Sequence, residues 1–174
     1  MKKFQFLLLD TGPIIKLFEL RIWDQFLKRC DVSISQTVAN EAKWASQEFE
    51  HVRIDLESYK DKIDIFDIDA SFAKSFLDRS NELYKAIIHA GEKETLAFLC
   101  SSPEKYLLCS SDKAVFQVLG LLGNGEQSVS LEEILERIGL SQRNLEWKYT
   151  KKFRERYTRV GQIDSVQSKG PYSL

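Results

Sequence analysis

Short apolar runs alternate with longer amphipathic stretches along this chain. The runs that we expect to form β-strands are Phe4–Leu9, Val32–Ser35, Ile63–Ile68, Tyr106–Cys109 and, at the edge of the sheet, Gln127–Val129. Phe4–Leu9 and Tyr106–Cys109 are almost continuously apolar, which is typical of parallel strands covered on both faces. The alternation of strands and helices predicts an α/β protein: a three-layer α/β/α sandwich with a central, mostly parallel sheet.

The stretches between these runs have the three- and four-residue apolar spacing of helices. Pro13 suits a first helical turn. Ser130 and Glu133 form the pattern of a capping box before an apolar run. Helices are expected from residue 13 and over 22–27, 38–49, 70–90, 91–101, 113–122 and 131–140. Residues 50–61 are polar and are expected to form a loop or an extended helix end.

The length of 174 residues fits one compact domain, with 43% hydrophobic and 29% charged residues. No apolar stretch approaches the roughly 20 residues that cross a bilayer, so no membrane association is expected. The first nine residues have the basic start and the apolar run of a signal peptide. Because Asp10 interrupts the apolar run, we interpret this segment as a β-strand. Three cysteines without CxxC spacing indicate reduced thiols and a cytoplasmic location.

The C-terminal part differs in charge from the rest of the chain. From residue 141 onward eight Lys or Arg face three Asp or Glu, a charge of +5, which leaves −6 for residues 1–140 within the total of −1. Leu145, Tyr149, Phe153 and Tyr157 recur every four residues and predict a basic, aromatic helix. We therefore divide the chain into a domain over 1–140 and this helix with a loose tail over 141–174.

Two of the apolar strands run directly into carboxylates. Asp10 follows FQFLLL, and Asp112 follows YLLC after Ser110 and Ser111. The carboxyl ends of parallel strands line the ligand crevice of open α/β sheets, so these acids are expected at one edge. A carboxylate in that position is partly desolvated and needs hydrogen bonds or a cation.

Three further acids belong to the same picture. Glu41 flanks the apolar stripe of its own predicted helix, where an unpaired charge is costly. Glu92 and Glu94 open the helix after Gly91, about 200° apart at ~100° per residue, so both cannot face one site. The spacing alone leaves the choice between Glu92 and Glu94 open.

Each acid also has an ordinary structural interpretation. Asp112 is a candidate helix N-cap, and Glu92 and Glu94 favour the positive end of a helix dipole. Asp10 with Thr11 and Gly12 fits turn chemistry, and Glu41 fits an ion pair. Because all of them fall at strand ends or on the first turns of the following helices, one shared metal site explains them better than four separate causes.

The chain resembles the PIN-domain family, in particular its bacterial and archaeal VapC-like branch, over about residues 4–140. The similarity lies in LLLDTGPIIKLF, VSISQTVANEA, HAGEKETLAFLC and YLLCSSDKAVFQVLGLLG, in that order. The resemblance implies that the family's four acidic positions, as catalytic residues and metal ligands, are Asp10, Glu41, Glu94 and Asp112, with Glu92 as the alternative to Glu94. It also implies auxiliary hydroxyl positions at Thr11 and at Ser110 or Ser111.

Clustered carboxylates repel one another unless a cation is bound, and Mg²⁺ or Mn²⁺ are the hard cations that prefer oxygen ligands. The resemblance implies hydrolysis of RNA phosphodiester bonds to a 3′-hydroxyl and a 5′-phosphate. It also implies that the chain forms a homodimer. If the chain is the toxin of a toxin–antitoxin pair, the resemblance implies an antitoxin protein as a second partner. The basic residues that we expect to bind RNA or a partner are Lys148, Lys151, Lys152, Arg154 and Arg156.

Competing functions make different demands on the sequence. A non-catalytic PIN-like module that binds RNA or protein would have lost acids, whereas all four positions are filled here. A phosphatase would carry Asp-x-Asp after its first strand, where this chain has Asp10, Thr11 and Gly12. His51 and His89 lack the paired spacing of a zinc site, and His89 is expected at a helix end.

Overall fold

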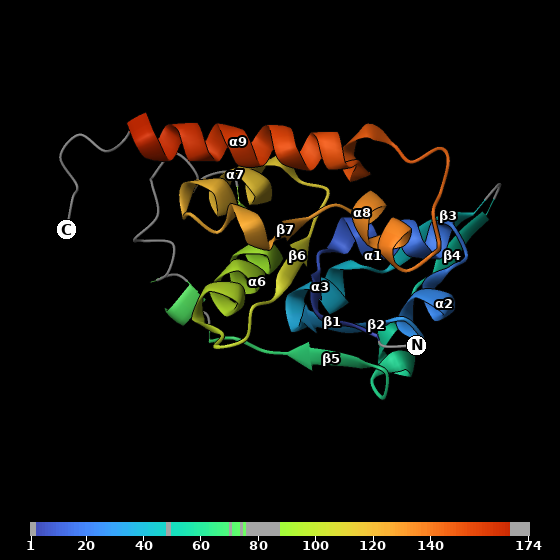
Figure 1. Cartoon of the computed structure of the whole chain (residues 1–174). Helices are drawn as coiled ribbons and strands as arrows, with labels where there is room; N and C mark the ends of the chain where they lie inside the picture. The colour runs from blue at the N-terminus through green and yellow to red at the C-terminus, as the bar shows by residue number, and fades with distance from the viewer. Residues whose placement is uncertain (1–2, 48–49, 70, 74, 76–87, 168–174) are drawn as a thin grey trace.

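Five parallel strands form the central sheet, in the order β5-β2-β1-β6-β7 (Figure 1). This computed structural model describes residues 3–47, 50–69, 71–73, 75 and 88–167. The strands are β1 (Phe4–Leu9), β2 (Cys30–Ser35), β5 (Ile63–Phe66), β6 (Leu107–Cys109) and β7 (Ser128–Val129). At the centre of the sheet Leu8 is in register with Ser33 of β2 and Leu108 of β6. All five predicted strands are therefore confirmed, some with shorter bounds.

Helices cover both faces of this sheet. They are α1 (Thr11–Glu19), α2 (Trp23–Leu27), α3 (Gln36–Glu41), α6 (Ala90–Ser101), α7 (Lys113–Leu121), α8 (Leu131–Arg137) and α9 (Lys151–Gln167). Three short 3₁₀ turns lie between them: η1 (Leu56–Tyr59), η2 (Gly125–Gln127) and η3 (Trp147–Tyr149). The predicted capping box of α8 is confirmed, because Ser130 and Glu133 exchange side-chain and backbone hydrogen bonds.

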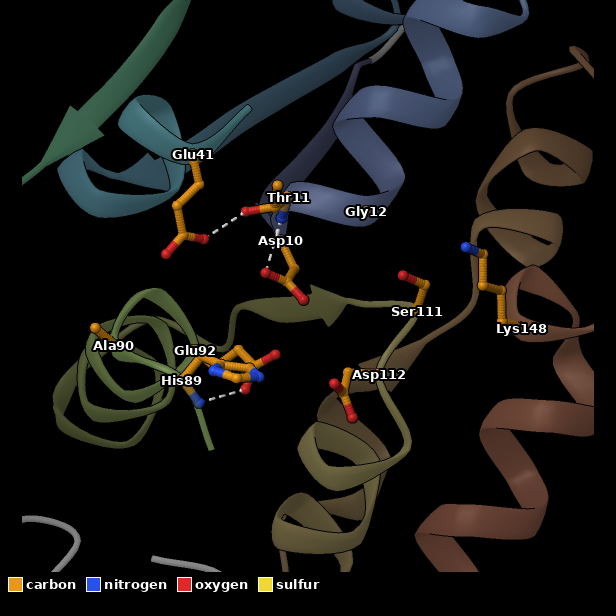
Figure 2. A pocket seen from close by; sticks show the side chains of 10 residues that line it. All are labelled: Asp10, Thr11, Gly12, Glu41, His89, Ala90, Glu92, Ser111, Asp112 and Lys148. Atoms are coloured by element: carbon orange, nitrogen blue, oxygen red, sulfur yellow. Dashed lines mark hydrogen bonds between the residues drawn. The ribbon is translucent and has the colours of Figure 1, made fainter. Parts of the chain in front are cut away.

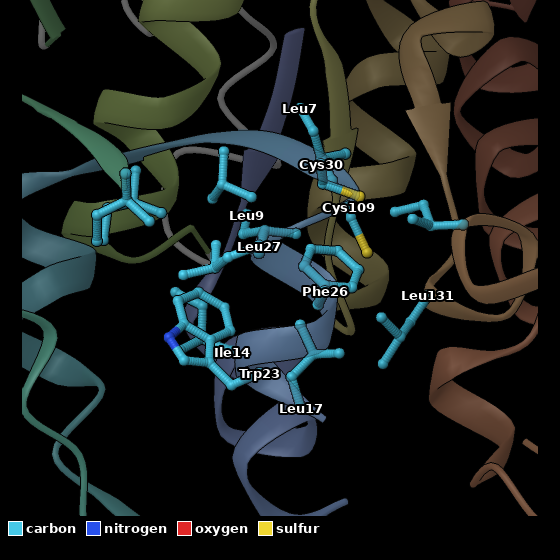
Figure 3. Close-up of a cluster of buried hydrophobic side chains, with 14 of the residues drawn as sticks. Leu7, Leu9, Ile14, Leu17, Trp23, Phe26, Leu27, Cys30, Cys109 and Leu131 are labelled. Atoms are coloured by element: carbon cyan, nitrogen blue, oxygen red, sulfur yellow. The ribbon is translucent and has the colours of Figure 1, made fainter. Parts of the chain in front are cut away.

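Two buried clusters lie on opposite faces of the sheet, because successive side chains of a strand alternate between its faces. Leu7 and Leu9 belong to the cluster of α1, α2 and α8 (Figure 3), and Leu8 belongs to the cluster of α6, α7 and α9. All three leucines are fully buried, each worth about 1.5–3 kcal/mol relative to an exposed side chain. The predicted three-layer α/β/α architecture is confirmed.

The helix predicted over 38–49 is wrong beyond Glu41. α3 ends there, and β3 (Trp44–Gln47) pairs antiparallel with β4 (Glu50–Arg53) in a hairpin. Trp44 is exposed and Ala45 is buried, so this stretch follows the two-residue period of a strand. The helical spacing was misleading because a hairpin also buries Ala45; Phe49 lies outside the described residues. β4 and η1 likewise occupy much of the predicted loop over 50–61.

The helix predicted over 70–90 lies mostly outside the described residues. Residues 71–73 and 75 are helical, and α6 begins at Ala90, one residue before the predicted start. Within the described part of the chain, no helix combines the length and the apolar character needed to span a membrane.

The single C-terminal helix predicted through Leu145 and Tyr149 is wrong in its first part. α9 begins at Lys151, because Thr150 is extended and its Oγ accepts a hydrogen bond from the amide of Phe153 at 3.3 Å. α9 lies along α7 in close contact (Figure 1), and an added Cβ at Gly161 would collide with the carbonyl of Gln117. Of the four residues that predicted this helix, Tyr149 and Phe153 are nonetheless buried, 3% and 7% exposed, while Leu145 and Tyr157 are half-buried.

Candidate functional site

A pocket of about 590 Å³ opens at the carboxyl ends of β1 and β6 (Figure 2). Its position follows from the topology, because β1 and β6 are adjacent and parallel and each runs into the N-terminus of a helix, α1 or α7. The residues that line it are Asp10, Thr11, Gly12, Glu41, His89, Ala90, Glu92, Ser111, Asp112 and Lys148.

Asp10 lies at the bottom of this pocket and is 7% exposed. It is the N-cap of α1, and its Oδ1 accepts a hydrogen bond from the amide of Thr11 at 2.7 Å. Its Oδ2 accepts a second hydrogen bond from Ser110 Oγ at 2.6 Å. These two hydrogen bonds lower the pKa of the Asp10 carboxyl. Burial raises it by more, and repulsion from Asp112 and Glu41 raises it further, so the net shift is upward.

Ser110 joins the two strand-end acids. Besides donating to Asp10, its Oγ accepts a hydrogen bond from the amide of Asp112 at 3.0 Å. Asp112 is the N-cap of α7, where its Oδ1 accepts from the amide of Ala114 at 2.7 Å. Asp112 therefore has the predicted capping role and also lines the pocket with a carboxylate. Ser111 lines the pocket as well, whereas the buried Ser110 lies behind it.

Glu41 reaches the pocket from the end of α3. Its Oε2 accepts a hydrogen bond from Thr11 Oγ1 at 3.0 Å, so the hydroxyl next to Asp10 orients the second acid. The structure gives Glu41 this hydroxyl partner among the described residues, in place of the ion pair that was the ordinary alternative. Thr11 and Ser110, both expected as auxiliary residues, thus hold pocket carboxylates through their hydroxyls.

Glu92 lines the pocket and Glu94 does not, which reverses the order in which we assigned them. Glu92 is 8% exposed, and its Oε2 accepts a hydrogen bond from the amide of His89, the N-cap of α6. Glu94 is directed elsewhere, with Oε1 accepting from Thr37 Oγ1 at 2.8 Å. The capped start of α6 therefore selects Glu92 as the third acid of the pocket.

The pocket concentrates negative charge. The pKa of Glu92 is raised to about 7, mainly by burial. The hydrogen bond from the His89 amide lowers this pKa, whereas repulsion from Asp10, Asp112 and Glu41 raises it. The N-termini of α1, α6 and α7 face the site and favour anions there. In this conformation, no three His, Cys, Asp or Glu side chains of the described residues lie close enough together to hold a metal ion.

The basic residues assigned to RNA or a partner have different surroundings. Lys148 lines the pocket, while Lys151, Lys152 and Arg156 are exposed on α9. Arg154 makes two hydrogen bonds to Glu133, of 3.2 and 2.7 Å, and only 17% of its side chain is exposed. This ion pair fastens α9 to α8, and the amide of Lys151 adds a second link by donating to Glu132 of α8 at 2.7 Å.

Three pocket residues, Gly12, His89 and Ala90, were missed as site residues. His89 and Ala90 line the pocket because α6 begins there, although His89 was correctly expected at a helix end. Their signal in the sequence is their position directly before the Gly91-Glu92 turn. Gly12 also lines the pocket, and an added Cβ there would collide with Ser111. This close approach explains a glycine in the first turn of α1.

No protein-family model and no curated protein matches the chain. The class that fold and site define is an α/β/α protein with an acidic pocket at the carboxyl edge of its parallel sheet. The PIN-domain resemblance stays a prediction that rests on the sequence motifs.

Proposed function

We propose that this protein is a Mg²⁺- or Mn²⁺-dependent endoribonuclease that hydrolyses RNA phosphodiester bonds in the pocket around Asp10. The observation that carries the proposal is the gathering of four carboxylates, from Asp10, Glu41, Glu92 and Asp112, around one open pocket. They come from four separate elements, and three of them, Asp10, Glu92 and Asp112, also cap the helices that begin at this edge.

The chemistry of the donors in the pocket, though not their spacing in this conformation, fits a hard divalent cation. All four acids offer carboxylate oxygens, the ligands that Mg²⁺ and Mn²⁺ prefer. Burial raises the pKa of Asp10 and of Glu92, and repulsion from the neighbouring carboxylates adds to this, so a bound cation would relieve that repulsion. When bound, such an ion polarises the phosphoryl group and supplies an activated water for in-line displacement.

The chain's own residues would prepare the pocket for this ion. Ser110 and Thr11 fix the carboxylates of Asp10 and Glu41 through their hydroxyls. Glu92, with a pKa of about 7, holds a proton on part of the molecules at neutral pH. A metal ion requires deprotonated ligands, so binding would release this proton and grow stronger as pH rises.

RNA as the substrate comes from the PIN resemblance and from the basic C-terminal segment. Lys151, Lys152 and Arg156 are exposed on α9, where they are available to phosphates of an extended strand. We further propose a cytoplasmic location, consistent with the three free cysteines of the described residues. An antitoxin partner and a homodimer belong to the same proposal.

Cleavage of mixed RNAs by purified wild type and Asp10→Asn tests the function. Asparagine keeps the shape of the side chain and one acceptor oxygen, so the fold of α1 is expected to persist. Wild type should cleave with Mg²⁺ or Mn²⁺ and stop in EDTA, and Asp10→Asn should lose at least about 100-fold in rate.

Glu92→Gln and Glu94→Gln form a matched pair on one helix. The first should abolish metal-dependent cleavage and the second should retain it, because Glu92 alone of the two lines the pocket. Equal cleavage by wild type and Asp10→Asn, or cleavage insensitive to EDTA, would overturn the mechanism. RNA binding without any cleavage would favour the alternative, a non-catalytic PIN-like RNA-binding module.

A further inference from the structure

We infer that Lys148 binds the scissile phosphate, an inference that rests on the proposed nuclease function and adds a residue to it. Lys148 belongs to η3, far from the acids in sequence, and yet it lines the same pocket. Among the described residues that line the pocket it is the only lysine or arginine. Figure 2 shows it on the side of the pocket opposite Glu41.

The ammonium group of Lys148 is available to a ligand. Half of its side chain is exposed, and its Nζ forms an ion pair with Glu146 Oε2 at 3.7 Å, a separation longer than that of a hydrogen bond. The other oxygen of Glu146 accepts a short hydrogen bond of 2.6 Å from Lys16, which is the stronger of the two contacts. Lys148 also lies above the ring of Tyr149, at 5.1 Å from its centre, and this contact restrains its direction.

The segment that carries Lys148 is fastened to the helix that Asp10 caps. Tyr149 is buried, and its hydroxyl donates to the carbonyl of Gly12 at 3.3 Å, two residues from Asp10. Glu146 pairs with Lys16 of α1, so η3 has contacts with both the first turn and the middle of that helix. The position of Lys148 relative to Asp10 is therefore set by direct contacts.

A cation in this position suits phosphodiester hydrolysis. The phosphate gains negative charge in the transition state, and a prepositioned ammonium stabilises that charge more than the ground state. The carboxylates would hold a metal ion on their side of the phosphate, and Lys148 would contact its oxygens from the other. Lysine is a common point-charge partner of phosphate oxygens.

Single-turnover cleavage of a fluorescent RNA by Lys148→Ala, Lys148→Arg and Lys105→Ala tests this role. Lys105 is a matched exposed lysine before β6, at the opposite edge of the sheet. Lys148→Ala should lower the rate at saturating protein about 10- to 100-fold. Lys148→Arg should recover most of that loss, and Lys105→Ala should stay within about twofold of wild type.

A calorimetric titration with Mg²⁺ measures metal affinity, which should not change if Lys148 has only a structural role. Removing a cation from the pocket should make Lys148→Ala bind Mg²⁺ about two- to fivefold more tightly than wild type, at low salt. Unchanged or weaker Mg²⁺ binding, or a cleavage rate within twofold of wild type, would overturn the inference.

Failure of the nuclease function is separable from failure of this inference. If wild type cleaves no RNA, inorganic phosphate replaces RNA as the probe, in the presence of Mg²⁺. Wild type should then bind phosphate at least about tenfold more tightly than Lys148→Ala. Equal phosphate binding by the two proteins would reject Lys148 as the phosphate contact.

Discussion

Replacing Glu92 by glutamine should make the metal-free protein more stable at neutral and alkaline pH. The folded carboxyl has a pKa of about 7 against an ordinary value of 4.5. The folded state therefore binds a proton more tightly than the unfolded chain, and the free energy of unfolding falls as pH rises from about 4.5 to about 7. Glutamine removes this loss and keeps an acceptor oxygen for the amide of His89.

The size of the effect follows from the shift. A change from 4.5 to about 7 corresponds to about 3 kcal/mol. The pocket is open to solvent, which screens its charges, so we expect about half of that, ~1.5 kcal/mol at pH 8. This is a rise of about 3–6 °C in Tm for a chain of this size. The difference should shrink to a few tenths of a kcal/mol at pH 4.5, where both proteins carry a neutral side chain.

Thermal unfolding in EDTA between pH 4.5 and pH 8 measures this, with exposed Glu126→Gln as the control. The control should follow the pH dependence of wild type. Added Mg²⁺ should reverse the order at pH 8, because wild type gains a ligand that Glu92→Gln lacks. Parallel pH profiles for wild type and Glu92→Gln would refute the burial argument, and unchanged stability on adding Mg²⁺ would refute the metal site.

Three further predictions concern packing and burial away from the pocket. Gly161→Ala should cost about 2–3 kcal/mol in urea unfolding, because an added Cβ collides with the carbonyl of Gln117 on α7; wild-type stability would contradict this. Arg154→Met should lower the free energy of unfolding by about 2 kcal/mol, because the Glu133 carboxylate, whose side chain is 12% exposed, loses its ion pair. A decrease of less than about 0.5 kcal/mol would show that the ion pair is dispensable. Cys109 should resist a disulfide-exchange reagent in native protein, because burial raises its pKa well above 9.0; fast labelling would show that the central strands open.

The centre of the sheet could be predicted from the sequence because its strands β1 and β6 are mostly apolar. The runs that end at Leu9 and Cys109 have few polar positions, so few other structures could bury them. The position of Asp10 and Asp112 then followed from the edge rule for parallel sheets. The hairpin of β3 and β4 was missed because Ala45 satisfies helical and strand spacing equally well, and only tertiary pairing with Val52 distinguishes them.

The choice between Glu92 and Glu94 needed the start of α6. A helix turns ~100° per residue, so a displacement of two residues moves a side chain to the other side of the helix. The sequence HAGEKE permits either acid to face the sheet edge. The amide of His89 donates to Glu92, which fixes the first turn and leaves Glu94 beside Thr37.

Helix capping alone does not account for the pKa values of the pocket acids. An acid that only caps a helix accepts amide hydrogen bonds and gains from the helix dipole, and both effects lower its pKa. Asp10 accepts two hydrogen bonds, and still its pKa is raised, because burial and neighbouring carboxylates outweigh them. The pKa of Glu92 is also raised, although its side chain accepts a hydrogen bond from the His89 amide. Capping therefore does not offset burial and the mutual repulsion of these carboxylates, and we expect a bound divalent cation to relieve that repulsion.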